Sequence, residues 1–232
     1  PAVETSLRPE PRPGLAAMGE GQPASASGFR AWVVKFAQQA QRERIPAAVI
    51  NAAFAGVSYD GEVVRRDRSQ AEFTRQIWEY LDSAVSASRV ANGRQALARH
   101  GDALAAIERR YGVPAEVVVA IWGMETSYGS YRGSDSVIRS LATLAYDGRR
   151  QVFFEERLMA ALKILAAGDV APRAMRGSWA GAMGHTQFMP TSFLDHAVDF
   201  TGDGRRDIWG DDPTDALASA ANYLAANGWQ TG

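Results

Sequence analysis

One acidic side chain, Glu125, closes an apolar stretch with helical spacing. Pro114 suits the first turn of a helix and Gly129 suits its end. Between them, Val118, Ile121 and Glu125 recur at intervals of three and four residues, so they share one face. A carboxyl group in a buried apolar stripe, at the negative end of the helix dipole, is expected to have a raised pKa. A general acid needs a raised pKa near neutral pH, so the pattern predicts proton-transfer chemistry at Glu125.

A purely structural role for Glu125 is the alternative. A glutamate at a helix end can lean outward and pair with an arginine, and Arg132 and Arg139 lie close by in the sequence. Structural ion pairs perturb carboxylates as catalytic sites do, and periodicity alone favours this alternative. The neighbouring motifs, described below, favour the catalytic role instead.

The elements that must position Glu125 are predicted to be helices. Ser69 and Glu72 form a capping box that opens one of them, and a break is expected near His100 and Gly101. The predicted helical segments are 29–44, a segment opened by Pro46, 69–81, 86–111, 114–128, 136–146 and 151–167. No segment alternates with a period of two for long enough to indicate a strand. We therefore predict a mainly α fold, interrupted by a glycine-rich stretch at 177–184.

Composition limits the class of protein. The chain has 232 residues, of which 46% are hydrophobic, enough for a buried core in one domain predicted to cover residues 29–232. Residues 1–28 are rich in Pro, Gly, Ala, Ser and Glu, and they are expected to form a disordered tail or linker. Lysine and arginine number 25 against 26 acidic residues, so the balanced charge argues against nucleic acid or an anionic membrane as a partner.

Cysteine is absent, which excludes disulfides, thiolate metal sites and cysteine nucleophiles. No run of 18 apolar residues predicts a transmembrane segment, and no export signal is visible. The chain opens with Pro1 rather than Met, so a processed or trimmed form is expected.

Five motifs follow one another in a specific order. They are Ala120-Ile-Trp-Gly-Met-Glu125-Thr-Ser-Tyr-Gly129; Leu141-Ala-Thr-Leu-Ala145 with Gly148-Arg-Arg150; Gly177-Ser-Trp-Ala-Gly-Ala-Met-Gly184 with Gln187-Phe-Met-Pro190; Asp203-Gly204 through Trp209; and Ala218-Ser-Ala-Ala-Asn-Tyr-Leu224. In these motifs the chain resembles the membrane-bound lytic murein transglycosylase B family. The resemblance implies a lysozyme-like catalytic domain, peptidoglycan glycan strands as the substrate, a periplasmic location and a monomer. It also implies that the chain lacks a C-terminal segment that relatives carry.

The same resemblance assigns roles to individual residues. Glu125 corresponds to the catalytic acid and base, Ser178 to a position that hydrogen-bonds the catalytic carboxylate, Gln187 to one that contacts the sugar, and Tyr223 to one that lines the cleft. Independently of the family, Gln187 and Phe188 offer a polar fork and a stacking face suited to a pyranose.

The arginine pair Arg149 and Arg150 is a further candidate for substrate binding. A guanidinium group binds a carboxylate through two hydrogen bonds, so the pair is suited to the peptide or lactyl carboxylates of peptidoglycan. A solvated helix end, with no role in binding, is the alternative.

The chemistry that the resemblance implies uses one carboxylate where most glycosidases use two. Protonated Glu125 gives its proton to the oxygen between N-acetylmuramic acid (MurNAc) and N-acetylglucosamine (GlcNAc). The resulting carboxylate removes the proton of the muramyl C6 hydroxyl, which attacks C1 and yields a 1,6-anhydro end. Water is not consumed, and no cofactor is expected for the chemistry. Because attacker and electrophile belong to one sugar, proximity lowers the barrier.

A loop that resembles the opening of an EF-hand follows the glycine-rich stretch. Oxygen side chains stand at its positions one, three, five and nine, with glycine at position six. Position twelve is Gly210 where a bidentate glutamate is usual, so another residue must close the site; the resemblance suggests Asp215, with Asp212 as its rival. A structural Ca²⁺ or Na⁺ is expected, and an Asx-rich turn without metal is the alternative. The predicted ligands are Asp199, Thr201, Asp203, the backbone carbonyl of Arg205, and Asp215.

Two other functions stay open at this point. A hydrolytic muramidase needs a second carboxylate to activate water, and Asp135 and Asp147 are the nearest candidates in the sequence. A non-catalytic peptidoglycan-binding module is the other possibility.

Two residues near the predicted cleft differ from the family pattern: His185 stands where Gln or an aromatic residue is expected, and Phe153 where some relatives carry Tyr. His100, His185 and His196 have no zinc spacing and are expected to be solvent or packing residues.

Overall fold

The computed structural model describes residues 26–69, 81–82 and 84–231. The tail predicted for residues 1–28 therefore lies almost wholly outside the described residues, and so does most of the helix predicted for residues 69–81. Helix α1 (Ala26–Arg42) starts three residues before Phe29, where order was expected to begin. Ser69, predicted to open a helix, follows the last residue of α3 (Gly61–Arg68).

The described chain is mainly helical, as predicted. Two short strands, β1 (Asp135–Ser136) and β2 (Arg176–Gly177), pair antiparallel. Periodicity cannot reveal strands of this length, because two residues are too few to show alternation. The remaining helices are α2 (Ala47–Phe54), α5 (Ala87–Arg99), α6 (Gly101–Tyr111), α7 (Ala115–Thr126), α8 (Val137–Asp147), α9 (Gln151–Ala167), α10 (Pro190–His196) and α11 (Thr214–Ala226).

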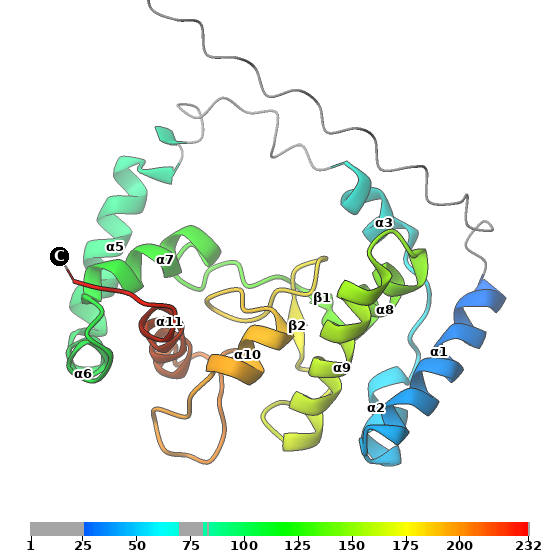
Figure 1. Ribbon diagram of the computed structural model, residues 1–232. Helices are drawn as coiled ribbons and strands as arrows, with labels where there is room; N and C mark the ends of the chain where they lie inside the picture. The colour runs from blue at the N-terminus through cyan, green and yellow to red at the C-terminus, as the bar shows by residue number, and fades with distance from the viewer. Residues whose placement is uncertain (1–25, 70–80, 83, 232) are drawn as a thin grey trace, which may run out of the picture.

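The helices pack around two hydrophobic cores. One core is built by α1, α2, α3, α8, α9 and α10 and contains Phe154 and Leu162. The other is built by α5, α6, α7 and α11 and contains Leu104, Ile107 and Trp122. In Figure 1, α5, α6, α7 and α11 lie on one side of the molecule and α1, α2, α3, α8 and α9 on the other, with β1, β2 and α10 between them. The chain leaves the end of α7 toward β1, so this end lies where the two groups meet (Figure 1).

Most predicted helix boundaries are confirmed. The break near His100 separates α5 from α6, and α9 covers residues 151–167 as predicted. The end of α7 differs, because the helix stops at Thr126 and the chain reaches Gly129 through a turn. Among the helices of the described residues, none combines the length and the apolar character needed to cross a membrane.

Candidate active site

Glu125 stands beside the buried face of α7, not within it. The helix buries Val118, Trp122 and Thr126, whereas Ile121 is only half-buried and Glu125 is exposed. The prediction that Glu125 continues a buried apolar stripe is therefore wrong. The physical reason is the large ring of Trp122, which is 4% exposed and sets the face that the helix turns to the core. Glu125 lies on the flank of that face.

The carboxyl group of Glu125 still has a raised pKa, and the cause is desolvation. The Glu125 side chain is exposed to water, but surrounding protein atoms replace part of the water that would otherwise solvate its charge. No described residue forms a hydrogen bond or ion pair with it. The two arginines of the structural alternative have other partners: Arg132 donates to the Trp209 carbonyl at 2.7 Å, and Arg139 pairs with Asp60 at 3.2 Å. The site thus holds an unpaired, partly dehydrated carboxyl group, as a general acid requires.

A left-handed turn ends α7 directly after Thr126, the residue that follows Glu125. In this turn Tyr128 has φ 60°, and its ring folds back between α5 and α7. Two glycines leave room for the ring: a Cβ at Gly123 would lie 2.5 Å from its Cζ, and a Cβ at Gly93 would lie 2.8 Å from its hydroxyl oxygen. The hydroxyl donates to the Arg89 carbonyl at 2.7 Å, and the Arg89 guanidinium donates to the Gly123 carbonyl at 3.2 Å. These contacts join the end of α7 to α5.

His185 contacts the end of α7 through its ring and through its backbone. Its Nδ1 accepts a hydrogen bond from the indole of Trp122 at 3.1 Å, and its carbonyl accepts one from Thr126 Oγ1 at 2.7 Å. Gly129 has φ 79°, and a Cβ there would lie 2.5 Å from the His185 ring. Burial lowers the pKa of His185, which favours the neutral ring. His185 is thus a packing residue, one of the two roles expected for it.

Ser178 begins a tight turn after β2. Its amide donates to the Ala182 carbonyl at 2.8 Å, and its Oγ accepts a hydrogen bond from the Ala182 amide at 3.1 Å. The predicted hydrogen bond between Ser178 and Glu125 is absent from the described structure. The hydroxyl proton of Ser178 has no acceptor among the described residues, so its role toward Glu125 stays a prediction.

Gln187 follows the same turn with φ 51°. Its Nε2 donates to the carbonyls of Gly184 at 2.9 Å and Arg132 at 3.2 Å. These two bonds fix the orientation of the side-chain amide. No described residue donates to Oε1, which therefore remains an acceptor for a sugar hydroxyl.

The aromatic candidates Phe188 and Tyr223 pack against each other, with ring centroids 5.9 Å apart. Phe188 is only 8% exposed, so the prediction that it offers a stacking face to a sugar is wrong. Tyr223, on α11, is 40% exposed and also packs edge-on against His196. The exposed ring is that of Tyr223, and Phe188 supports it from below the surface.

Arg149 and Arg150 both bind Asp67, whose side chain is 1% exposed. Arg149 Nε donates to its Oδ2 at 2.8 Å, and Arg150 donates to its Oδ1 at 2.6 Å. Both arginines are also exposed to solvent, at 47% and 40%, so the alternative of a solvated helix end stays open. A substrate carboxylate would have to use the remaining N–H groups, and binding by this pair stays a prediction. Asp67 could not be found from the sequence, because 82 residues separate it from Arg149.

The two carboxylates considered for water activation are both paired with arginines. Asp135 pairs with Arg66 at 3.7 Å and Arg139 at 3.9 Å. Asp147, 6% exposed, pairs with Arg68 at 2.9 Å. Both candidates are thus engaged in ion pairs with arginines in the described structure.

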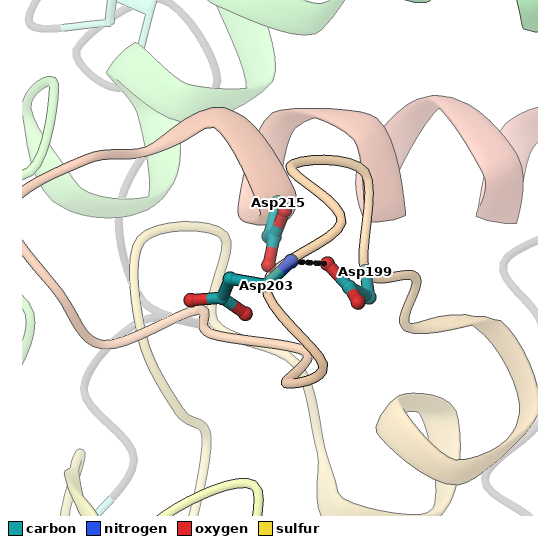
Figure 2. A group of neighbouring side chains, drawn as sticks. All are labelled: Asp199, Asp203 and Asp215. Atoms are coloured by element: carbon teal, nitrogen blue, oxygen red, sulfur yellow. Dashed lines mark hydrogen bonds between the residues drawn. The ribbon is translucent and has the colours of Figure 1, made fainter.

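Three carboxylates of the predicted cation loop lie together. Asp199, Asp203 and Asp215 each offer an oxygen within 4.8 Å of the others, and Figure 2 shows the three around the loop and the start of α11. Asp215 is buried, and its oxygens accept hydrogen bonds from backbone amides of the loop. Desolvation works against ionisation of Asp199, but the amides of Gly204, Gly202 and Asp203 together lower its pKa. A cluster of hard oxygen atoms suits Ca²⁺.

The other residues of the loop have separate roles. Thr201 donates to Asp199 at 3.4 Å, and Arg205 lies 3.6 Å from Asp203. The rival ligand Asp212 binds Thr214, at 2.6 Å from its hydroxyl, and is not one of the three clustered carboxylates.

Comparison with known proteins places this geometry in a family. Residues 28–232 match the transglycosylase SLT domain family model. The chain is 40% identical over 154 residues to membrane-bound lytic murein transglycosylase B of Escherichia coli, a match that covers 66% of this chain and 42% of that protein. The chain therefore belongs to the transglycosylase SLT domain family.

Solved structures agree with this assignment. SltB3 from Pseudomonas aeruginosa, in complex with NAG-NAM-pentapeptide, superposes with a TM-score of 0.85 at 56% identity, covering 88% of this chain and 54% of SltB3. Escherichia coli Slt35 in complex with calcium superposes with a TM-score of 0.74 at 32% identity, covering 90% of this chain and 65% of Slt35. This chain thus spans about half the length of its relatives.

Proposed function

We propose that this chain is a lytic transglycosylase that cleaves the MurNAc-β-1,4-GlcNAc bond of peptidoglycan and leaves 1,6-anhydroMurNAc ends. The observation that carries the proposal is the state of Glu125 in a chain of this family. Its carboxyl group has a raised pKa and no ion-pair partner among the described residues. Such a group retains its proton at a higher pH than an ordinary glutamate, as an acid catalyst must.

Glu125 acts twice in the proposed reaction. Its proton passes to the bridging oxygen as the bond from that oxygen to the muramyl C1 breaks. The carboxylate then removes the proton of the C6 hydroxyl of the same muramyl residue, and O6 bonds to C1. The proton returns to Glu125, so the enzyme is regenerated and no water enters the product. Both carboxylates that a hydrolytic route could use are paired with arginines, which favours the one-carboxylate route.

Substrate contacts are proposed for the polar and exposed residues that the family motifs single out. Ser178 would donate its free hydroxyl proton to the Glu125 carboxylate, and Gln187 would accept from a sugar hydroxyl through Oε1. Tyr223 would offer its exposed ring to the sugar, since aromatic rings pack against the apolar faces of pyranoses. Arg149 and Arg150 would use their remaining N–H groups for a carboxylate of the substrate.

Digestion of purified sacculi followed by mass analysis tests the function. The wild-type chain should release fragments with anhydro ends, lighter by one water than hydrolytic products. Glu125→Gln should lower the rate to less than about one hundredth of wild type, because it removes the only acid and base. Glu116→Gln, an exposed glutamate in the first turn of the same helix, is the matched control and should retain the rate.

Other product patterns would contradict the proposal. Fragments with reducing ends would indicate a hydrolytic muramidase. Binding to sacculi without release of fragments would indicate a peptidoglycan-binding module. Glu125→Gln activity above the stated threshold, with the fold intact, would remove Glu125 from the mechanism.

A structural Ca²⁺ or Na⁺ is proposed for the loop of Asp199, Asp203 and Asp215. The clustered hard oxygens support it, and so does the relative whose structure was solved with calcium. Calcium at about 100 times its Kd would stabilise the fold by about 2.7 kcal/mol, which corresponds to a Tm increase of about 5–10 °C. Asp215→Asn should abolish the increase and Asp212→Asn should preserve it. A Tm that neither calcium nor a chelator changes would refute the site.

The periplasm is the proposed location, because its substrate would be there and the relative from Escherichia coli is named as a membrane-bound murein enzyme. Fractionation of cells that naturally produce the protein tests this location.

A further inference from the structure

His185 is buried, with 4% of its surface exposed, and both of its ring nitrogens have partners inside the protein. Nδ1 lies 3.1 Å from the indole nitrogen of Trp122, and Nε2 lies 2.8 Å from the carbonyl oxygen of Gly210. An indole N–H can only donate, so Nδ1 must accept and the ring proton must be on Nε2. Nε2–H then donates to the Gly210 carbonyl, and Arg132 Nη1, which lies 3.1 Å from Nε2, donates to the same carbonyl and not to the ring. The two partners thus select one neutral tautomer of His185.

The backbone of His185 makes two more hydrogen bonds to the same two elements. Its carbonyl accepts from Thr126 Oγ1 at 2.7 Å, and its amide donates to the Ile208 carbonyl at 3.0 Å. Trp122 and Thr126 flank Glu125 on α7, one turn before it and directly after it. A single buried residue therefore joins the last turn of α7 to the segment Ile208–Gly210.

The surroundings of the ring leave it little freedom. Gly129 lies so close that a Cβ there would be 2.5 Å from Nδ1. On the other side, Arg132 donates to the carbonyls of Trp209 and Gly210 and holds the segment that accepts the His185 proton. A ring confined on both sides transmits a displacement of one element to the other, because packed interiors deform little.

We propose that His185 is a positioning residue for Glu125, and that it fixes the catalytic turn of α7 through its bridge from Trp122 to Gly210. His185 does not contact Glu125 and takes no part in proton transfer. The inference rests on the proposed function, in which Glu125 must reach both the bridging oxygen and the C6 hydroxyl. Displacement of a catalytic group by about 1 Å can lower a rate about 100-fold, so a bridge of this kind affects turnover.

Two substitutions separate bridging from packing. His185→Gln retains one acceptor and one donor, whereas His185→Leu fills similar space without either. We expect His185→Leu to lower kcat by about tenfold or more with KM within about twofold, and His185→Gln to recover kcat to within about threefold of wild type. Leu162→Ala, in the other hydrophobic core, is the control for lost stability and should keep kcat at a temperature where it is folded.

Two structural measurements do not depend on turnover. In His185→Leu, the indole N–H resonance of Trp122 should shift and the amide of Tyr128, which donates to Trp122, should exchange faster with solvent. Amides in α9 should be unchanged, and His185→Gln should resemble wild type.

The outcomes distinguish this inference from the proposed function. If wild type is active and His185→Leu keeps its kcat within twofold, or if His185→Gln loses as much kcat as His185→Leu, the positioning role is refuted. If wild type releases no anhydro fragments, the proposed function fails. In that case hydrogen exchange of the Tyr128 amide alone tests the bridge: faster exchange in His185→Leu supports it, and unchanged exchange refutes it.

Discussion

Replacement of Gly123 by alanine tests how the end of α7 is held. A Cβ at this position would lie 2.5 Å from Cζ and 2.6 Å from the hydroxyl oxygen of Tyr128. The ring has little room to move toward α5, because it already packs closely against Gly93: a Cβ added there would lie 2.8 Å from the same hydroxyl oxygen. The ring must therefore leave its site, and its hydrogen bond to the Arg89 carbonyl must break.

The expected change in the free energy of unfolding has opposing parts. Alanine is favoured over glycine inside a helix by about 0.8–1 kcal/mol. Forced repacking costs about 1–3 kcal/mol, and the lost hydrogen bond about 0.5–1.5 kcal/mol. The net result is a destabilisation of about 0.5–3.7 kcal/mol. Helix propensity alone predicts a gain, so the sign of the change distinguishes the two accounts.

Urea denaturation of single and double variants measures this change. Gly101→Ala, at the first residue of α6 with no atom within 4 Å of the added Cβ, is the control and should leave the midpoint unchanged or slightly raised. In a Tyr128→Ala background the obstacle is gone, so Gly123→Ala should stabilise the fold by up to about 1 kcal/mol. The argument fails if Gly123→Ala stabilises the otherwise wild-type chain, or if its effect is the same in both backgrounds.

Three further predictions follow from the paired and the desolvated groups. Asp67→Asn removes the shared charged partner of Arg149 and Arg150 and should lower the free energy of unfolding by about 1–3 kcal/mol; the loss is no larger because both arginines can then bind water. Urea denaturation measures the change, with the exposed Asp102→Asn as the control. An unchanged midpoint would show that the ion pairs contribute nothing. Glu125 must be protonated to start the reaction, so activity should decline as pH rises through its raised pKa, and a decline already complete in the range of ordinary glutamates would contradict the desolvation. Burial lowers the pKa of His185 in the fold; Arg132 lowers it further, whereas Gly210, Asp207 and Asp211 oppose the shift. Between the lowered pKa and about 6.5 the unfolded chain therefore binds more protons than the folded chain, so stability should fall as pH drops below about 6.5. His185→Gln should reduce this pH dependence and leave the part due to His100.

The parts of the fold that the sequence could predict are those with a local cause. Helix α9 and the break between α5 and α6 follow from apolar spacing and from turn residues, and the structure agrees at these positions. The end of α7 was predicted at Gly129 because glycine favours a helix stop. The helix predicted for residues 114–128 stops at Thr126, since Tyr128 folds back into a space made by Gly93 on another helix. A single-helix pattern contains no information about that partner.

In the candidate site, too, features with a local cause could be predicted from the sequence, and features set by tertiary packing could not. Glu125 could be singled out from its helix and its motif, and its raised pKa agrees with the expectation. Its exposure could not be predicted, because the ring of Trp122 determines which face of α7 is buried. Phe188 looked like a sugar platform by residue type alone, whereas α11 covers it with Tyr223. Asp67 carries no local signal, and only the packing of α3 near α8 brings it to Arg149.

The pKa of Glu125 is raised by desolvation alone, and the arginines nearest to it in the sequence, together with the Arg149 and Arg150 pair, are bound to other acceptors. An unpaired guanidinium near the carboxyl group would favour its charged form and lower its pKa. Arg132 is held by backbone carbonyls, and Arg139 is held by Asp60. Arg149 and Arg150 both form ion pairs with the buried Asp67. The fold thus satisfies these cations with other acceptors, and desolvation, which acts in the opposite direction, is left to set the pKa of Glu125.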